Sequence, residues 1–552
     1  MNSKTRLLLI GLLILFVLVR LPGLAVPYQQ DEFKTAIAAE QSLSEASAFL
    51  AHPPLTAVLL RSDAIVFGGG NLRVMPLLFG LISAILLFCV MKRRFNERAG
   101  LWSVFLYSIS FYGIWSSLML DTDGAILPAL FLSALYCYDR ARDDSKKSRR
   151  WVSLLALVLV TGLLVKLSFV LVVGVFIADF LFEKRKELSA ARIAYFGSVG
   201  LSLVILTVAA FALIKFLNPA FNIQGMISHA LYYVRLSGRN YLQVVIESVK
   251  ALFYLSPLLL IPLFFISKET IKKATPFLWY LALGFVFYFI LFDFSHGALD
   301  KYLMFTIIPL CAISGAILSQ LISPLNLRAY SRQIIAGAIV SAALIALMFV
   351  PPEVVPLYPK TAWFSRVIHG NWNMLIPFNG GSGPVGFYVS FLIIASSFII
   401  ASIAALTGLM RKPLLSTAAI VIICSGVAYN VAFMEEFSFG KVYGSTIDAL
   451  RPALAYVSAE KAIKNVNTHN DIGAYELKHI GKYGSHFTAA PQFEDLSRNV
   501  FPTYKGAFLV VDIPPLYDGF YRDFFNSCTI LFTARSGVIT STVYSSCTWT
   551  KE

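Results

Sequence analysis

Long apolar runs, separated by short polar loops, recur along most of this 552-residue chain. A run of roughly 17–25 apolar residues is long enough to cross a lipid bilayer as a helix. The runs lie near residues 5–26, 72–91, 99–119, 123–138, 151–165, 167–182, 192–217, 249–267, 276–292, 302–322, 333–350, 385–409 and 413–433. Charged residues make up only 14% of the sequence, whereas soluble domains carry about a quarter. The pattern predicts an α-helical integral membrane protein with about thirteen transmembrane helices.

The basic residues between the runs predict how the chain is oriented, because basic loops stay on the cytoplasmic side. If Lys4 and Arg6 are cytoplasmic, the other basic clusters fall on the same face. These clusters are residues 92–98, 139–150, 183–192, 267–274, 326–333 and 410–412. The opposite face receives loops 27–71, 218–248, 293–302 and 351–384, and everything after residue 433. We therefore expect a multi-pass protein of a bacterial inner membrane with a cytoplasmic N-terminus. The net charge of +15 is a topology signal, and no nucleic-acid partner is expected.

Two domains follow from this pattern, a transmembrane domain over residues 1–433 and a soluble periplasmic domain over 434–552. The first apolar run is read as a retained anchor because no small-x-small cleavage site precedes Pro27. After residue 434, strand-length runs at 506–514, 529–534 and 537–545 alternate with helical patterns at 446–463 and 515–526. This alternation predicts a small α/β domain. In an oxidising compartment Cys528 and Cys547 could form a disulfide; two free cysteines are the alternative.

The loops on the non-cytoplasmic face carry amphipathic segments. In residues 33–50, apolar and polar residues alternate with the spacing of one amphipathic helix that lies flat at the membrane interface. Residues 232–253 show a similar pattern. The second segment brings Arg235 and Arg239 to the membrane surface. Lys166 interrupts one long apolar stretch at "GLLVKLSF", which predicts a tight re-entrant pair of short helices.

Ionisable residues gather near this same face. They are Asp31 and Glu32 after the first run, His52 with Pro53 and Pro54, Asp121 and Asp123 in the turn "LDTDG", Lys166, and His296, Lys301 and Tyr302 in "HGALDKY". Each has a structural alternative: Lys166 could snorkel, Asp123 could cap a helix, His52 could bond its loop, and Lys301 could be an interface anchor. Together, acids and bases at one membrane surface indicate a site that handles a phosphate.

The order of these motifs resembles the polyprenyl-phosphate-dependent glycosyltransferases. These are GT-C integral membrane enzymes of the protein-mannosyltransferase type, including the bacterial aminoarabinose transferase that modifies lipid A. The resemblance covers roughly residues 1–433, and the C-terminal domain matches only in place and size. It implies a GT-C fold and an inverting enzyme that moves a sugar from an undecaprenyl phosphate donor to a glycolipid or glycan of the cell envelope.

The resemblance also implies roles for single residues. Asp31 matches the first-loop acid, with Glu32 beside it, and either Asp121 or Asp123 matches the second-loop acid. Lys301 and Tyr302 match an Arg-Tyr pair, and Lys166 matches a lysine of the family, although a following Gly-Pro is absent. His52 stands where the aminoarabinose enzymes have Lys, which puts that substrate in doubt.

The chemistry of sugar transfer explains why such residues would be needed. A lipid phosphate leaves as the anomeric C–O bond breaks, and Lys166, Lys301, Arg235 or Arg239 would neutralise its charge. Asp31 would accept the proton of an attacking hydroxyl or orient the acceptor. A divalent metal ion at Asp31 and His52 is an open alternative, with no fixed spacing to support it. A protein O-mannosyltransferase-like activity, a flippase for lipid-linked sugars and a scaffold for envelope assembly are the competing functions.

Overall fold

The computed structural model describes residues 3–50, 52–143, 147–184, 190–234, 241–291, 299–322, 330–356, 360–378, 386–517 and 519–549. By its contacts the chain divides into two compact units. The first comprises residues 1–24, 35–329 and 405–419, and the second comprises 25–34, 330–404 and 420–552. The expected domain boundary after residue 433 stays a prediction, because these units are discontinuous in sequence.

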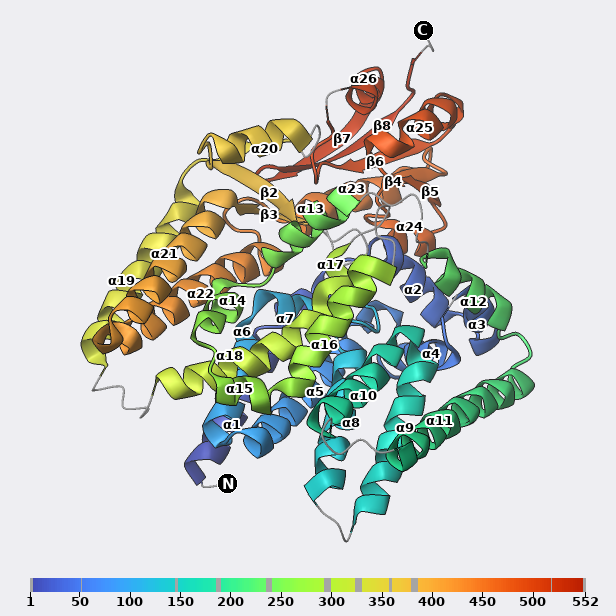
Figure 1. Cartoon of the computed structure of the whole chain (residues 1–552). Helices are drawn as coiled ribbons and strands as arrows, with labels where there is room; N and C mark the ends of the chain where they lie inside the picture. Colours follow the sequence, from blue (N-terminus) through green and yellow to red (C-terminus); the bar gives the residue numbers. More distant parts are fainter. Residues whose placement is uncertain are drawn as a thin grey trace. The chain divides into compact units, whose positions relative to one another are not determined.

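The first unit is entirely helical in its described part (Figure 1). Its helices are α1 Ser3–Leu18, α3 Leu43–Phe49, α4 Pro54–Phe67, α5 Val74–Arg94, α6 Glu97–Ile109, α7 Phe111–Ser116, α8 Ile126–Asp143, α9 Ser148–Val165, α10 Val170–Lys184, α11 Ala190–Leu217, α12 Ile223–Tyr232, α13 Tyr241–Leu252, α14 Pro257–Leu260, α15 Lys268–Lys273, α16 Thr275–Val286, α17 Leu299–Tyr302 and α18 Ile307–Leu321. Helix α2 Gln30–Glu40 begins in the second unit and continues into the first.

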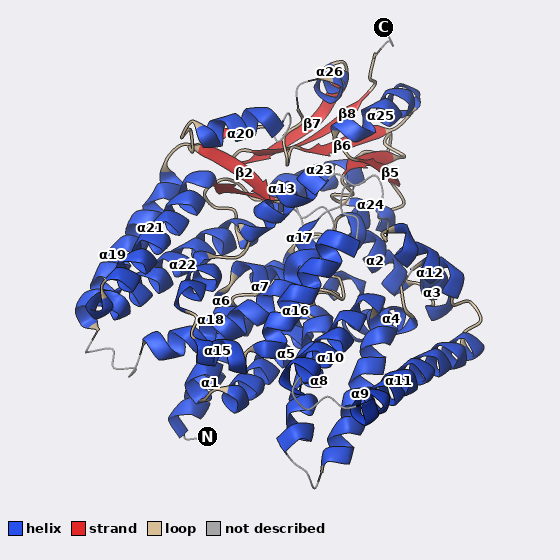
Figure 2. Ribbon diagram, viewed as in Figure 1, coloured by secondary structure: helices blue, strands red, loops and turns tan. Residues whose placement is uncertain are grey.

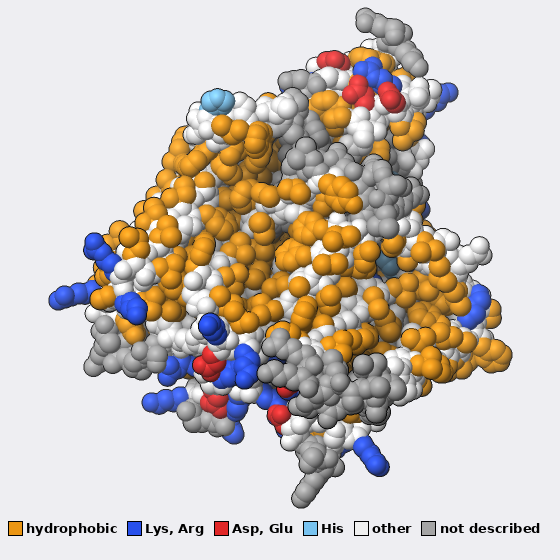
Figure 3. All heavy atoms as spheres, in the orientation of Figure 1, with side chains coloured by type: hydrophobic (Ala, Val, Ile, Leu, Met, Phe, Trp, Pro, Cys, Tyr) orange, Lys and Arg blue, Asp and Glu red, His pale blue; other side chains and the backbone are white. Residues whose placement is uncertain are grey.

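Eight of the described helices or helical segments are long and apolar enough to cross a membrane. Helix α11 illustrates the lipid-facing type, because Leu201, Val208 and Leu213 are each more than half exposed. In water such a surface would be unfavourable, whereas lipid tails solvate it. Figure 3 shows a broad hydrophobic surface on this face of the molecule, with Lys and Arg side chains gathered near α15. The expected number of about thirteen spans stays a prediction.

Close helix packing in the first unit depends on small residues. Helix α18 packs along α6, and a Cβ added at Gly315 would lie 2.3 Å from Oγ of Ser103. Helix α5 packs against α6 in the same way, because a Cβ at Gly100 would lie 2.8 Å from the ring of Phe88. Small residues let helix backbones approach closely in a membrane protein.

Two apolar runs that the sequence predicts as single spans are broken in the structure. The run 99–119 is divided at Ser110, whose side chain accepts a hydrogen bond from the amide of Gly113 and so starts α7. The run 249–267 is divided where Ser256 and Pro257 begin the short helix α14. The segment 33–50 is likewise two helices, because Ser42 and Glu45 form a capping box that starts α3.

The second unit combines membrane-type helices with two sheets (Figure 2). Its helices are α19 Ser331–Ala346, α20 Lys360–Ile368, α21 Phe391–Met410, α22 Leu415–Ser438, α23 Thr446–Ala459, α24 Ala474–His479, α25 Glu494–Val500 and α26 Phe520–Asn526. Helices α21 and α22 each have one end in the first unit. The strands are β1 Glu353–Val354, β2 Met374–Phe378, β3 Phe387–Ser390, β4 Val466–His469, β5 Tyr483–Phe487, β6 Ala507–Val511, β7 Thr529–Ser536 and β8 Ile539–Ser545.

The five-stranded sheet has the order β5-β4-β6-β8-β7. Strands β5, β4 and β6 are parallel, whereas β6, β8 and β7 are antiparallel, with Phe508 opposite Tyr544. An aromatic core that includes Phe501, Tyr521 and Phe524 packs against it. The sulfurs of Cys528 and Cys547 are bonded at 2.02 Å, the pairing that the sequence suggested. The three-stranded sheet β1-β2-β3 was not anticipated from the sequence.

Arg20 is a fully buried residue that joins three elements of the first unit. Its guanidinium donates hydrogen bonds to Oγ of Ser117 at 2.6 Å and to the carbonyl oxygens of Phe16, Ser108 and Tyr107. It also lies 3.5 Å from the centre of the Phe16 ring. One side chain therefore satisfies carbonyls from α1 and from the end of α6.

We expect Arg20→Leu to lower the free energy of unfolding by about 3 kcal/mol, because it leaves buried carbonyl oxygens without a donor. Arg20→Lys should lose less, since it keeps a charge but not the planar set of five donors. Denaturant or thermal unfolding of both variants in detergent micelles measures this. An unchanged midpoint for Arg20→Leu would contradict the role of Arg20.

Candidate functional site

The turn between α7 and α8 positions two acids. The carboxylate of Asp121 accepts hydrogen bonds from the backbone amides of Thr122 and Asp123, and the bond from Asp123, two residues on, is the Asx pattern that favours a turn. Gly124 lets the turn lie directly against α7, because a Cβ there would lie 2.1 Å from the carbonyl oxygen of Ser116. Asp121 and Asp123 are thereby held on the first unit, with side chains only 16% and 7% exposed.

Lys166 lies where α9 ends. Its backbone is extended, with φ −154° and ψ 134°, and the chain turns there into α10. Gly162 makes this turn feasible, because a Cβ there would lie 2.1 Å from the ring of Phe169. Thr56 of α4 donates a hydrogen bond to the carbonyl oxygen of Val165 at 2.6 Å. The break at Lys166 lies where the sequence predicts it, and the structure forms it as two helices joined by a short 3-10 turn.

Lys301 and Tyr302 come from α17, immediately before the apolar segment that leads into α18. The Lys301 ammonium lies 5.0 Å from the centre of the Tyr302 ring, and the Lys166 ammonium lies 5.8 Å from it. One aromatic face therefore serves both cations, an arrangement that stabilises ammonium groups with little water around them.

Four charged side chains form one buried cluster, which we call the acid–lysine cluster: Asp121, Asp123, Lys166 and Lys301. The two oxygens of Asp121 lie 3.6 Å from Nζ of Lys166 and 3.3 Å from Nζ of Lys301. Asp123 is ion-paired with Lys166. The four residues are spread over 180 positions of sequence, so only the fold brings them together. The sequence could not say which acid matters; the structure shows that Asp121 bridges both lysines.

The pKa values of the two acids of the cluster are shifted in opposite directions. Burial alone would raise the pKa of Asp121, but the Lys166 and Lys301 ammoniums lower it below the usual value. The pKa of Asp123 is raised, because burial and the neighbouring Asp121 outweigh Lys166. The pKa of Lys166 is raised by both acids in spite of burial. Asp121 is therefore the permanent anion of the cluster, and Lys166 stays cationic.

His52, Pro53 and Pro54 form the start of α4. Pro53 is the N-cap and Pro54 occupies the first turn, where its missing N–H is not needed. Burial and the nearby ammonium of Lys166 lower the pKa of His52 to about 3, so the imidazole is neutral at physiological pH. Its ring meets that of His229 edge-on at 5.8 Å. His229 was missed from the sequence, because a lone histidine on α12 belongs to no motif.

We expect His52 to make folding stability depend on pH. The unfolded chain binds a proton at this side chain near pH 6.5, whereas the folded protein does so only near pH 3. Stability therefore falls as the pH drops below 6.5, by up to about 1.4 kcal/mol per pH unit. His52→Asn should flatten the fall in melting temperature between pH 7 and pH 5. An equal fall in the wild-type protein and the variant would contradict this assignment.

Asp31 and Glu32 lie in the second unit, in the first turn of α2. Asp31 is about half exposed and forms an ion pair with Lys34 at 3.7 Å, whereas Glu32 is fully buried. The neighbouring Phe33 ring packs against that of Tyr483 at 5.1 Å. The two adjacent acids thus have different environments, a difference that their sequence positions do not reveal.

The C-terminal sheet places a further acid beside this segment. Asp471 follows β4 and accepts a hydrogen bond from the hydroxyl of Tyr483 at 2.7 Å, and Nδ1 of His486 lies 3.4 Å away. Burial raises the pKa of Asp471; His486 and Lys34 oppose this shift, and Asp31 adds to it. Asp471 is therefore a further acid near Asp31 that sequence reasoning missed; its only signal was the polar run "NTHND".

Three predicted residues, Arg235, Arg239 and His296, lie outside the described part of the chain. Among the residues that are described, no three His, Cys, Asp or Glu side chains are grouped to hold a metal ion. A metal at Asp31 and His52 stays a hypothesis from the sequence.

Comparisons with known proteins agree with the resemblance seen in the motifs. Residues 51–212 match the family model of dolichyl-phosphate-mannose-protein mannosyltransferase, a range that contains His52, Asp121 and Lys166. No curated protein sequence matches the chain significantly. The crystal structure of ArnT from Cupriavidus metallidurans bound to undecaprenyl phosphate is 15% identical, covers 97% of both chains and has a TM-score of 0.56. Its apo structure is 16% identical, with a coverage of 97% and 98% and a TM-score of 0.55.

This similarity extends along nearly the whole chain, so it confirms the predicted fold class, whereas the number of spans and the domain boundary stay predictions. Together with the eight long apolar helices of the described residues, this similarity indicates a multi-pass membrane protein. The chain has the GT-C fold of the membrane glycosyltransferases, and its residues 51–212 are similar to the protein-mannosyltransferase family within that class.

Proposed function

We propose that this chain is an inverting membrane glycosyltransferase that moves a sugar from a polyprenyl phosphate to an acceptor of the cell envelope. The observation that carries the proposal is the acid–lysine cluster, two buried ammoniums held by one aspartate at the ends of apolar helices. Buried ionisable groups at the edge of a membrane domain are costly and mark functional sites. The fold is shared with ArnT, which has been crystallised with undecaprenyl phosphate.

The lysines are suited to hold the phosphate of the donor. When the anomeric C–O bond breaks, its electron pair goes to the lipid phosphate, whose negative charge grows. Lys166 and Lys301 would stabilise that charge in a site with little water, where fixed cations are most effective. Asp121 keeps both ammoniums oriented before the donor arrives, since its carboxylate lies within 3.6 Å of each.

An apolar cavity next to Lys301 suits the polyprenyl tail. It has a volume of about 240 Å³ and is lined by Val249, Leu252, Phe285, Phe289 and Leu303 among others. Leu303 of the lining follows the Lys301–Tyr302 pair directly in sequence, which supports placing the phosphate near that end of the cavity. A ligand with an anionic head and a long apolar tail would satisfy both regions.

The family resemblance assigns the acceptor side of the reaction to Asp31. The half-exposed carboxylate of Asp31 would take the proton of an attacking hydroxyl, while the new C–O bond forms on the face opposite the departing phosphate. If the acceptor is itself an anionic phosphate, no base is needed, and Asp31 would orient it. The neighbouring Asp471, Tyr483 and His486 supply polar groups with which the C-terminal sheet could recognise a glycan.

We infer a cell-envelope glycolipid or glycan as the acceptor, with lipid A or lipopolysaccharide as the leading case, on the periplasmic face of the inner membrane. The similarity to ArnT supports this reading. The family model matched by residues 51–212 favours a second candidate, transfer to Ser or Thr hydroxyls of secreted proteins. His52, which replaces the lysine expected in aminoarabinose enzymes, is compatible with either.

The test is transfer of a radiolabelled sugar from polyprenyl phosphate by the full-length protein in nanodiscs, with a glycolipid and a Ser/Thr peptide offered as separate acceptors. Label in the glycolipid supports the first proposal, and label in the peptide supports the second. No transfer to either, together with donor flux across proteoliposomes, would replace both with a flippase. Mass spectrometry of envelope lipids from a deletion strain identifies the natural product.

A further inference from the structure

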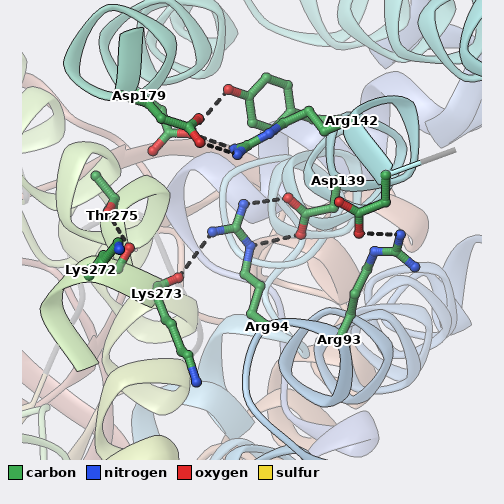
Figure 4. A network of polar contacts seen from close by, with 11 residues as sticks. Arg93, Arg94, Asp139, Arg142, Asp179, Lys272, Lys273 and Thr275 are labelled. Atoms are coloured by element: carbon green, nitrogen blue, oxygen red, sulfur yellow. Dashed lines mark hydrogen bonds and ion pairs between the residues drawn. The ribbon is translucent and has the colours of Figure 1, made fainter. Parts of the chain in front are cut away.

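A charged pocket lies at the opposite ends of the helices from the proposed donor site. It is formed by the last turns of α5 and α8 and by the end of α15 (Figure 4). Its volume is about 190 Å³, and its lining residues are Arg93, Arg94, Asp139, Arg142, Asp143 and Lys273. Helix α5 belongs to an apolar segment that ends at Arg94, and the apolar α16 follows Lys273 at once. The pocket therefore lies where the hydrocarbon region ends and headgroups begin.

One buried ion pair makes the rigid part of this pocket. Arg94 donates two hydrogen bonds to the carboxylate of Asp139, and a third to the carbonyl oxygen of Lys273 at 3.0 Å. The side chains of Arg94 and Asp139 are only 12% and 8% exposed. Figure 4 shows how this pair ties α5, α8 and α15 together. The pocket is thus preformed, and Arg94 is fully occupied.

The other cations of the pocket have exchangeable partners. Arg93 pairs with Asp143, which is 63% exposed, and Lys273 pairs with Glu269, which is 70% exposed. Arg142 pairs with Glu183, and both of these side chains are about two-fifths exposed. Arg142 also lies 3.7 Å from the carboxylate of Asp179, which is 5% exposed and is therefore not among the exchangeable partners. Ion pairs between exposed groups contribute little stability, so another anion can replace the exposed carboxylates at little cost.

Arg93 also has an unused donor. Its buried Nε–H has no hydrogen-bond acceptor among the described residues. A buried donor without an acceptor is unfavourable, and an incoming oxygen atom would satisfy it. A phosphate has more than one acceptor oxygen and matches the planar guanidinium in a bidentate way.

We propose that this pocket binds the phosphate of an anionic glycerophospholipid from the leaflet that faces the basic loops. The lining carries four cations against two carboxylates, a net charge of +2. When Asp143, Glu183 and Glu269 turn to water, the cations face the lipid phosphate instead. The cytoplasmic leaflet is the anionic one, and basic pockets at the ends of membrane helices bind its headgroups. The lipid would hold α5, α8 and α15 together, and its role is separate from sugar transfer.

The test uses the full-length protein in nanodiscs of phosphatidylcholine with or without 30% phosphatidylglycerol. We expect phosphatidylglycerol to raise the melting temperature of the wild-type protein, and native mass spectrometry to retain a bound anionic lipid. Arg93→Gln combined with Arg142→Gln should abolish both effects. Asp143→Asn should strengthen them, because it removes the carboxylate that competes for Arg93. Arg149→Gln is the matched control, since Arg149 is an exposed basic residue of α9 outside the pocket.

Equal melting temperatures in the two bilayers would overturn the proposal. An unchanged response of the double variant to phosphatidylglycerol would also overturn it. An equal loss of the response in Arg149→Gln would do so too, because it would indicate attraction by surface charge alone. Inorganic phosphate added to the phosphatidylcholine nanodiscs, with chloride at matched ionic strength, distinguishes the source of the anion. An equal rise with free phosphate would overturn the assignment to a lipid. None of these readouts depends on glycosyltransferase activity.

Discussion

Replacing Lys301 with Gln is expected to lower the rate of sugar transfer by about 100-fold or more, the usual effect of removing one group that stabilises developing negative charge. The ammonium is almost buried, and it lies 3.3 Å from the carboxylate of Asp121. The polar Gln side chain keeps most of the volume but supplies no charge to the departing phosphate. Single-turnover transfer from a labelled polyprenyl-phosphate sugar measures the loss in the chemical step.

The controls separate catalysis from folding. Lys301→Gln leaves Asp121 with one cation fewer, and breaking a buried pair is itself destabilising. The double variant Lys301→Gln with Asp121→Asn should regain melting temperature without regaining activity. Lys301→Arg keeps the charge and matches the residue that the family resemblance implies, so it should retain most of the rate. Wild-type activity in folded Lys301→Gln would remove Lys301 from the proposed mechanism.

Asp31→Asn is expected to reduce transfer to a hydroxyl acceptor by about 100-fold or more at neutral pH, the typical contribution of a general base. The variant should fold normally, because the ion pair of Asp31 with Lys34 is half exposed and such pairs contribute about 1 kcal/mol or less. Single-turnover transfer of a labelled sugar to the hydroxyl acceptor measures the loss.

Glu32→Gln is the matched comparison for Asp31→Asn. Glu32 is fully buried, so its substitution should cost more stability than that of Asp31, while the protein that still folds retains the rate of transfer. This pair of variants answers which of the two adjacent acids does chemistry. If Asp31→Asn were fully active with a hydroxyl acceptor, another residue would have to be the base. Asp471, which lies near Asp31, would be the first candidate.

Much of the fold could be predicted from local patterns. Apolar runs identified the membrane helices, since lipid requires every backbone group to be paired within the segment. The strand β6 and the paired strands β7 and β8 were anticipated from short runs of β-branched and aromatic residues. The breaks at Ser110 and Ser42 were not, because they depend on a single capping side chain within an otherwise continuous pattern.

The candidate site was predicted by residue type and was assembled only by the fold. The sequence selected Asp121, Asp123, Lys166 and Lys301 because charges near the membrane edge are costly. It could not show that Asp121 contacts both lysines, because contacts across 180 positions depend on how α9 and α17 pack. It also missed His229 and Asp471, whose importance comes only from their neighbours.

The sequence alone determined that this is a membrane protein and which charged residues lie near the ends of its apolar segments. Both follow from the length and hydrophobicity of each segment, which are local properties. The tertiary structure decided the rest. It made Asp31 half exposed and Glu32 buried, and it joined the acid–lysine cluster from three distant segments. It also gathered six charged residues from three helix ends into one pocket. Those outcomes depend on which helices pack together, and packing is set by the shapes of many side chains at once.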